Sequence, residues 1–132
     1  MTLVVDASVV VAALVDTGSV GLWAEDRLAD DALAAPHLMP AEAANVLRRA
    51  EHRREISADT AAVAYADLGE ISVELFSFEP FAERVWQLRA NVTPYDAWYV
   101  ALAETLDTHF ATLDHRLAAA AGPTCTFETP PR

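Results

Sequence analysis

Four acidic side chains, far apart in the chain, each follow an apolar segment or lie near the start of a helical one. Asp6 comes directly after the apolar run of residues 3–5, and Asp114 follows residues 110–113. Glu42 and Asp96 lie in the first turns of predicted helices. Carboxylates that meet in one cleft repel one another, so at least one is driven toward protonation unless a cation is present. Because oxygen ligands select hard divalent ions, the cluster predicts Mg²⁺ or Mn²⁺ rather than zinc.

Each of these acids also has a purely structural explanation. Asp6 and Asp114 belong to a residue type that caps helices well, and a helix is predicted after each. Asp96 lies three residues after Thr93, the spacing of a capping box, which is worth about 0.5–1 kcal/mol. Glu42 can simply favour the dipole of its helix. These alternatives stay open for each residue alone, and the position that all four share favours a common site.

The elements that must position these acids alternate along the chain. Apolar runs predict strands at residues 3–5, 33–36, 72–78, 109–114 and 124–128. Helical periodicity and start signals predict helices at residues 8–15, 20–30, 40–54, 57–69, 80–90, 93–106 and 115–121. This alternation favours a parallel α/β sheet, in which the carboxyl ends of strands and the starts of the following helices share one edge. We expect the four acids to meet at that edge.

Length and composition indicate a folded domain. The chain has 132 residues, of which 53% are hydrophobic and 22% charged. We expect one domain over residues 1–132, with residues 129–132 as a disordered tail. No stretch reaches the roughly 18 apolar residues that a membrane helix needs, and the N-terminus lacks the basic region of a signal peptide, so we expect a cytoplasmic protein with no membrane partner. The single Cys125 excludes an internal disulfide.

The charge balance is strongly acidic, with a formal net charge of −11, and all nine basic residues are arginines. Such a charge repels nucleic acid at long range, so a polyanionic partner needs a local basic exception. The absence of lysine argues against signalling receiver domains and haloacid-dehalogenase-type phosphatases, which both depend on one. The phosphatases also need an Asp-x-Asp pair, where this chain has Asp6, Ala7 and Ser8.

Taken in order, the motifs resemble those of PIN-domain ribonucleases, and specifically the VapC toxins of bacterial toxin–antitoxin pairs. The resemblance covers nearly the whole chain at family-like spacing. One departure is Met39-Pro40 ahead of Glu42, where a serine or threonine is commoner and where Met39 would be the helix N-cap. The matching stretches are VVDAS with Asp6 and Ser8, PAEAANVL with Glu42 and Asn45, TPYDAWYVALA with Asp96, and ATLDHRL with Thr112 and Asp114.

The resemblance implies a fold and a reaction. The fold is a PIN-like three-layer sandwich, with a central, mostly parallel sheet of four to five strands flanked by helices. The reaction is endonucleolytic cleavage of RNA by a metal-activated water. Asp6 and Asp96 would be the principal metal ligands, while Glu42 and Asp114 would bind a second ion or orient water. A module that has lost catalysis and only binds RNA or a protein is the alternative.

Polar residues around the acids are given supporting roles. Ser8, Asn45 and Thr112 are candidates to hold carboxylates or a phosphate by hydrogen bonds, and otherwise are capping or solvated residues. Arg49 and Arg116 are candidates to neutralise RNA phosphates because they lie near the predicted acids. The alternative for Arg49 is a solvated helix face on which Glu51 and Glu55 pair with the arginines.

Apolar surface suggests protein partners. The predicted helix 8–15 is apolar nearly all round, and Trp23, Trp86, Trp98 and Tyr99 add large rings. Surplus apolar patches mark interfaces, although one core could also bury all of these residues. The resemblance implies a homodimer and a cognate VapB-like antitoxin, whose C-terminal segment would lie in a groove between the early helices and block the acids.

Overall fold

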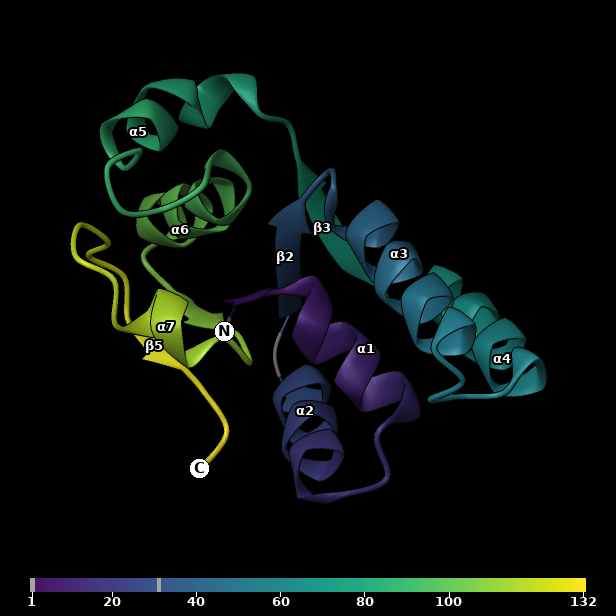
Figure 1. Ribbon diagram of the computed structural model, residues 1–132. Helices are drawn as coiled ribbons and strands as arrows, with labels where there is room; N and C mark the ends of the chain where they lie inside the picture. The colour runs from purple at the N-terminus through teal and green to yellow at the C-terminus, as the bar shows by residue number, and fades with distance from the viewer. Residues whose placement is uncertain (1, 31) are drawn as a thin grey trace.

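A five-stranded sheet with all strands parallel forms the centre of the molecule, as the sequence predicts (Figure 1). The computed structural model describes residues 2–30 and 32–132. The strand order is β3-β2-β1-β4-β5, so β1 is central and β3 and β5 are the edges. The strands are β1 (Thr2–Val5), β2 (Ala32–Pro36), β3 (Val73–Phe76), β4 (His109–Ala111) and β5 (Phe127–Glu128).

Three strands are shorter than predicted. The predicted strand 72–78 is paired only over residues 73–76, and 109–114 only over residues 109–111. In the second case Thr112 and Asp114 turn away to start a helix, because Asp114 caps it. The predicted strand 124–128 is reduced to residues 127–128, since Thr124 bonds to a helix instead of the sheet. The alternation of strands and helices is therefore right and these strand ends are wrong.

The helices cover both faces of the sheet, with α5 and α6 on one side and α1 to α4 on the other (Figure 1). Three predicted helices were too long: the helix predicted over residues 40–54 ends at His52, residues 80–90 form η1 and the short α5, and the helix after Asp114 ends at Ala118. The helices are α1 (Ala7–Val15), α2 (Ser19–Asp30), α3 (Met39–His52), α4 (Ala58–Glu70), the 3-10 turn η1 (Glu79–Phe81), α5 (Ala82–Gln87), α6 (Pro94–Leu106) and α7 (His115–Ala118).

The core forms where α6 packs against the sheet and where α1 packs against the neighbouring helices. Helix α6 contacts β1, β2 and β4, and its small side chains Ala97 and Ala101 are buried. Helix α1 is enclosed by α2, α3 and α4, and its residues 9–12 are buried. Most of this apolar helix is thus buried within one core and gives little support for an interface. In the part of the chain that the structure describes, no single helix is long and apolar enough to cross a membrane.

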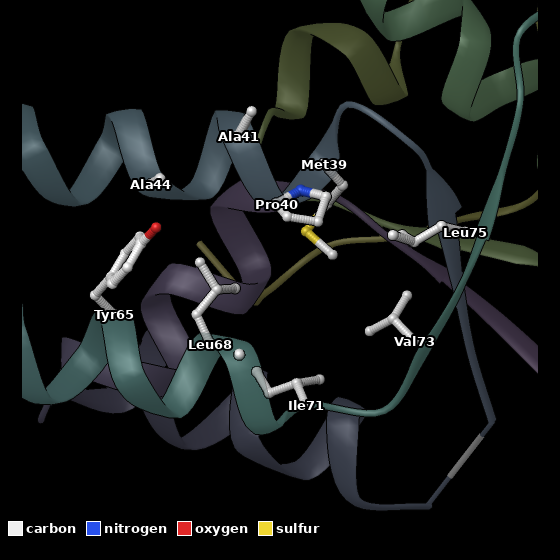
Figure 2. A pocket seen from close by; sticks show the side chains of 10 residues that line it. Met39, Pro40, Ala41, Ala44, Tyr65, Leu68, Ile71, Val73 and Leu75 are labelled. Atoms are coloured by element: carbon white, nitrogen blue, oxygen red, sulfur yellow. The ribbon is translucent and has the colours of Figure 1, made fainter.

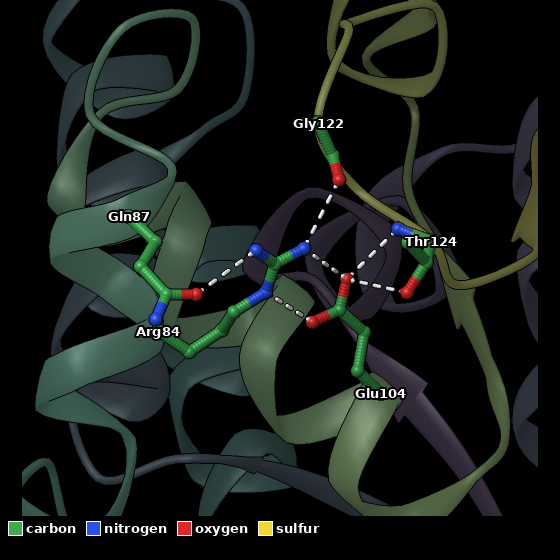
Figure 3. Close-up of polar contacts among 5 residues, drawn as sticks. All are labelled: Arg84, Gln87, Glu104, Gly122 and Thr124. Carbon is green, nitrogen blue, oxygen red and sulfur yellow. Dashed lines mark hydrogen bonds and ion pairs between the residues drawn. The ribbon is translucent and has the colours of Figure 1, made fainter.

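A polar network anchors the segment between α7 and β5 (Figure 3). Arg84 of α5 donates to both carboxylate oxygens of Glu104 on α6, at 2.7 and 3.0 Å, and to the carbonyl oxygen of Gly122 at 3.0 Å. The backbone and hydroxyl of Thr124 donate to Glu104 at 2.8 and 2.9 Å. Although burial alone would raise it, these bonds hold the pKa of Glu104 below its usual value. The network thereby brings β5 beside β4.

The strand order places a crevice beside β1. The chain runs outward from β1 to β2 and β3, and then crosses back over α5 and α6 to β4 on the other side of β1. The order therefore reverses between β1 and β4. In open parallel sheets, ligands bind outside the carboxyl ends of the strands at such a switch point. Asp6 follows β1 directly, and Asp114 lies just beyond β4.

Candidate active site

Asp6 lies at the carboxyl end of the central strand and caps the helix that follows it. Its backbone N–H donates to the carbonyl oxygen of Ala111 at 3.0 Å, which continues the pairing of β1 with β4. Its Oδ1 accepts from the backbone N–H of Ser8 at 3.2 Å, and its Oδ2 accepts from the hydroxyl of Thr112 at 2.8 Å. The capping role is therefore real, and it fixes the carboxylate at the edge of the sheet.

Two hydroxyl groups tie the loop after β4 to the turn after β1. Thr112, whose side chain is fully buried, donates to Asp6 and accepts from the backbone N–H of Asp114 at 3.1 Å. The hydroxyl of Ser8 accepts from the backbone N–H of Leu113 at 3.3 Å. Asp114 caps α7 by accepting from the backbone N–H groups of Arg116 and Leu117 at 2.9 and 3.1 Å. These contacts hold Asp6 and Asp114 in one local structure.

Asp96 and Glu42 come from the first turns of α6 and α3. Thr93 is the N-cap of α6, as predicted, and its hydroxyl accepts from the backbone N–H of Asp96 at 3.3 Å. The predicted N-cap of α3 was wrong: the cap is Leu38, which has no side-chain bond to the helix, and Met39 is the first helical residue and is buried. Pro40 lacks an N–H in any case, so this turn leaves fewer donors to be capped.

Repulsion between pairs of the acids raises the pKa values of three of them. Burial raises the pKa of Asp6, and the charge of Asp114 raises it further. The pKa of Glu42 is raised by burial and by the charges of Asp6 and Asp96. The pKa of Asp96 is raised by burial and by the charges of Asp6 and Asp114. Because the charged forms are disfavoured, a cation at this edge would lower the free energy of the cluster.

An open cleft of about 460 Å³ borders this cluster. Asp96 and Asp114 line it together with Arg116, Thr93 and Asn91. An anion that entered the cleft would therefore meet one arginine beside two carboxylates.

Comparison with known proteins identifies the chain. The family model of the PIN domain matches residues 3–123. The chain is 44% identical to ribonuclease VapC1 of Mycobacterium tuberculosis over 123 residues, and this alignment covers 92% of each protein. It is 36% identical to the VapC ribonuclease Mb0985 of Mycobacterium bovis over 130 residues, covering 98% of this chain and 99% of the relative. The chain belongs to the PIN-domain family, among its VapC ribonucleases.

A solved structure shares the fold of this PIN domain. VapBC2 from Rickettsia felis, solved bound to a DNA fragment from its promoter, superposes with a TM-score of 0.69 over 99% of this chain and 100% of that chain, at 13% identity. At this level of identity the likeness concerns the fold alone. It agrees with the parallel sheet and flanking helices described above.

The PIN domain contains one buried site residue that sequence reasoning had assigned to an interface. Tyr99 is 2% exposed, and its hydroxyl donates to Oε1 of Glu42 at 2.7 Å. Its ring stacks on Phe110, with centroids 5.4 Å apart and planes 2° from parallel. Because Tyr99 follows Asp96 by three positions on α6, helical spacing alone places both on one face, and that signal could have found it.

The supporting residues of the PIN domain divide into two groups. Ser8, Thr112 and Arg116 lie at the carboxylates or in their cleft. Asn45 does not contact a carboxylate: it is exposed, and its side-chain oxygen accepts from Nε of Arg48 at 3.1 Å. Arg49 is exposed on the same helix. The expectation that Asn45 holds an acid therefore finds no contact to support it.

The donor set fits a hydrated hard cation in an open site. All the acidic groups present oxygen atoms, which suits Mg²⁺ or Mn²⁺. Within residues 2–30 and 32–132, no three His, Cys, Asp or Glu side chains are arranged to hold an ion between them. Mg²⁺ commonly keeps several waters and uses only one or two carboxylates, so it does not require three protein ligands around it.

Proposed function

We propose that this chain is a VapC-type endoribonuclease toxin of the cytoplasm, which cleaves RNA phosphodiesters with Mg²⁺ or Mn²⁺. The observation that carries the proposal is the set of carboxylates at the switch point, where burial and neighbouring charges raise the pKa values of Asp6, Glu42 and Asp96. Such a cluster costs folding free energy without a cation, and an acid cluster kept at that cost is typical of a functional site. The PIN-domain match supports the same reaction class.

The carboxylates have separate roles in this proposal. Asp6 and Asp96 would hold the metal ion, and Glu42 and Asp114 would bind a second ion or orient water. When bound, the ion supplies a Lewis acid and lowers the pKa of a bound water. Thr112 and Ser8 fix Asp6 and the loop that carries Asp114, through the hydrogen bonds described above. Asn45 is left out because its partner is Arg48.

Arg116 is the better candidate of the two predicted RNA contacts. It is exposed and lines the cleft with Asp96 and Asp114, so a phosphate that reaches the acids would also reach this guanidinium. Arg49 follows Glu42 by seven positions on α3, about 10 Å along the helix, and would contact a neighbouring phosphate. With a net charge of −11, the protein offers RNA few other attractive sites.

A VapB-like antitoxin would bind the apolar groove beside α3 (Figure 2). This groove of about 420 Å³ lies between α3, α4 and the edge strand β3. Figure 2 shows Tyr65 and Leu68 on one side of it and Leu75 and Val73 on the other. No acidic residue lines the groove, so it is not a candidate catalytic site. Met39 and Pro40 in its lining are three and two residues from Glu42 in the sequence. An apolar peptide segment there could continue to the acids.

The homodimer stays a prediction, and the exposed rings give it a place to be tested. Trp86 remains 65% exposed on α5, whereas Tyr99 is buried in the core and cannot belong to an interface. Light scattering of the purified chain, with and without Trp86→Ser, measures the association directly. A monomer at all concentrations for both proteins would end the homodimer hypothesis.

The function is tested by sequencing the 5′ ends of RNAs that are cut after the protein is induced, with Asp96→Asn as the inactive control. The expected result is a set of new ends for the wild type, their loss in the variant, and their suppression when the antitoxin is co-expressed. Purified protein should cut RNA with Mn²⁺ and not with EDTA. Full cleavage by Asp96→Asn would refute the site, and RNA binding without cleavage would favour the catalytically inactive module.

A further inference from the structure

Tyr99 connects the two helices that supply acids to the site. It lies on α6, one turn after Asp96, and its hydroxyl donates to Glu42 on α3 across 2.7 Å. The phenol is 2% exposed, so water does not compete for this bond. The hydrogen bond therefore joins α6, which carries Asp96, to Glu42 on α3.

The surroundings of Glu42 explain why such a link is needed. Glu42 is half-buried, and the negative charges of Asp6 and Asp96 act on it. An unrestrained glutamate with two rotatable bonds beyond Cβ would turn outward, away from this repulsion and into water. A donor that binds the carboxylate from the protein side opposes that movement. Tyr99 is such a donor, and its own position is fixed by the parallel stack with Phe110 of β4.

We propose that Tyr99 is a positioning residue for the metal site, holding Glu42 by one oxygen so that its carboxylate stays turned toward Asp6 and Asp96. This inference rests on the proposed metal-dependent function and adds a residue to it. A purely structural role for the ring predicts that the hydroxyl is dispensable. A positioning role predicts that the hydroxyl affects metal binding through Glu42.

The experiment measures Mn²⁺ binding by calorimetry on the full chain, without RNA. Tyr99→Phe keeps the ring and its stack with Phe110 and removes only the hydroxyl. We expect the dissociation constant for Mn²⁺ to rise about tenfold, the lower end of what loss of a ligand's hydrogen-bond partner costs. Tyr95→Phe is the matched control, because Tyr95 lies on the same helix and is 62% exposed. The control should bind Mn²⁺ as the wild type does.

A second pair of variants tests whether Tyr99 acts through Glu42. In the Glu42→Ala background, Tyr99→Phe should cause no further loss of Mn²⁺ affinity. Cleavage of RNA by Tyr99→Phe should recover when Mn²⁺ is raised about tenfold, which a damaged fold would not allow.

Each other outcome overturns the inference. Equal Mn²⁺ affinity in wild type and Tyr99→Phe, or a loss that persists in the Glu42→Ala background, refutes the positioning role while leaving the ribonuclease proposal intact. A Tyr99→Phe protein that does not fold shows that the hydroxyl serves the fold. If the wild type itself binds no Mn²⁺ and cuts no RNA, the proposed function fails and this inference fails with it.

Discussion

Replacing Asp96 by Asn should stabilise the protein in EDTA. Asp96 is half-buried, and its pKa is raised by burial and by the charges of Asp6 and Asp114. A raised pKa means that the folded protein binds this proton more tightly than the unfolded chain does. Holding the ionised form at neutral pH therefore costs folding free energy. Asparagine removes the charge and keeps a side-chain oxygen for the contact with Thr93 that lowers the pKa of Asp96.

The size of this effect follows from three contributions. Repulsion between partly exposed like charges is worth roughly 0.5 kcal/mol for each of the two neighbouring acids, after allowance for solvent screening. Relief of the partial burial of the charge adds a similar amount, about 0.5 kcal/mol. The lost interaction with the amino end of α6 opposes these by about 0.5 kcal/mol. The net gain is about 1 kcal/mol, or roughly 4 °C in Tm for a domain of this size.

Divalent metal should make the wild type more stable than the Asp96→Asn protein. A ligand that binds only the folded state stabilises it by about 1.4 kcal/mol at ten times its dissociation constant. Asp96→Asn loses one of the two proposed principal ligands, so it should gain much less from Mg²⁺. The variant should thus melt above the wild type in EDTA and below it in Mg²⁺.

The assay is thermal unfolding followed by circular dichroism, in EDTA and across a Mg²⁺ titration. Asp59→Asn is the matched control, since Asp59 is also in the first turn of a helix but is exposed on α4. It should lose about 0.5 kcal/mol by the helix dipole alone, with the same response to Mg²⁺ as the wild type. An Asp96→Asn protein less stable than the wild type in EDTA would refute the reasoning from repulsion.

Three further predictions concern the pH dependence of the Asp96→Asn effect and the roles of three arginines. In EDTA, the stability gain of Asp96→Asn should vanish below pH 3.8, the ordinary pKa of Asp, and grow as the pH rises through the raised pKa of the folded state, measured by urea unfolding. Arg116→Ala should reduce the salt slope of RNA binding by about 1, and Arg49→Ala by less, in filter-binding titrations; equal slopes for both variants and the wild type would return the two arginines to a solvated face. Arg84→Met should cost about 2–3 kcal/mol in urea unfolding because it leaves Glu104 half-buried without its cation, and a loss under 0.5 kcal/mol would contradict the anchoring role of the network.

The sequence predicts where each acid lies relative to its own strand or helix, because that place depends only on neighbouring residues in the chain. Thr93 and Pro94 mark the start of α6, which fixes Asp96 in its first turn. The short apolar run before Asp6 is typical of a buried strand in a parallel sheet whose strands alternate with helices. Asp6 therefore lies at the carboxyl end of that strand. Once the strands are parallel, their carboxyl ends share an edge without any knowledge of packing.

The sequence does not predict which side chains of different helices come into contact. The bond from Tyr99 to Glu42 depends on how far α3 lies from α6, and helical spacing along the chain does not contain that distance. Asn45 shares a helix face with Glu42 by spacing, yet its side chain binds Arg48 and not the acid, and a contact of Asn45 with a phosphate stays a prediction. The length of the last strand was overestimated because it also depends on a contact between distant parts of the chain: Thr124 bonds to Glu104 and not to the sheet.

At Asp6 the capping role and the proposed metal-binding role fall on the same carboxylate, and this decides how the site can be probed. Both carboxylate oxygens of Asp6 accept hydrogen bonds, one from the N–H of Ser8 and one from the hydroxyl of Thr112. Asparagine there would turn an amide donor toward one of these donors, so Asp6→Asn removes a charge and disturbs the turn together. Its inactivity could come from either change. Asp96 contributes its backbone N–H to the cap of α6, which leaves its carboxylate free to change charge without loss of the helix start. The loss of metal-dependent activity in Asp96→Asn, with stability kept or raised, is therefore the cleaner sign of a metal ligand.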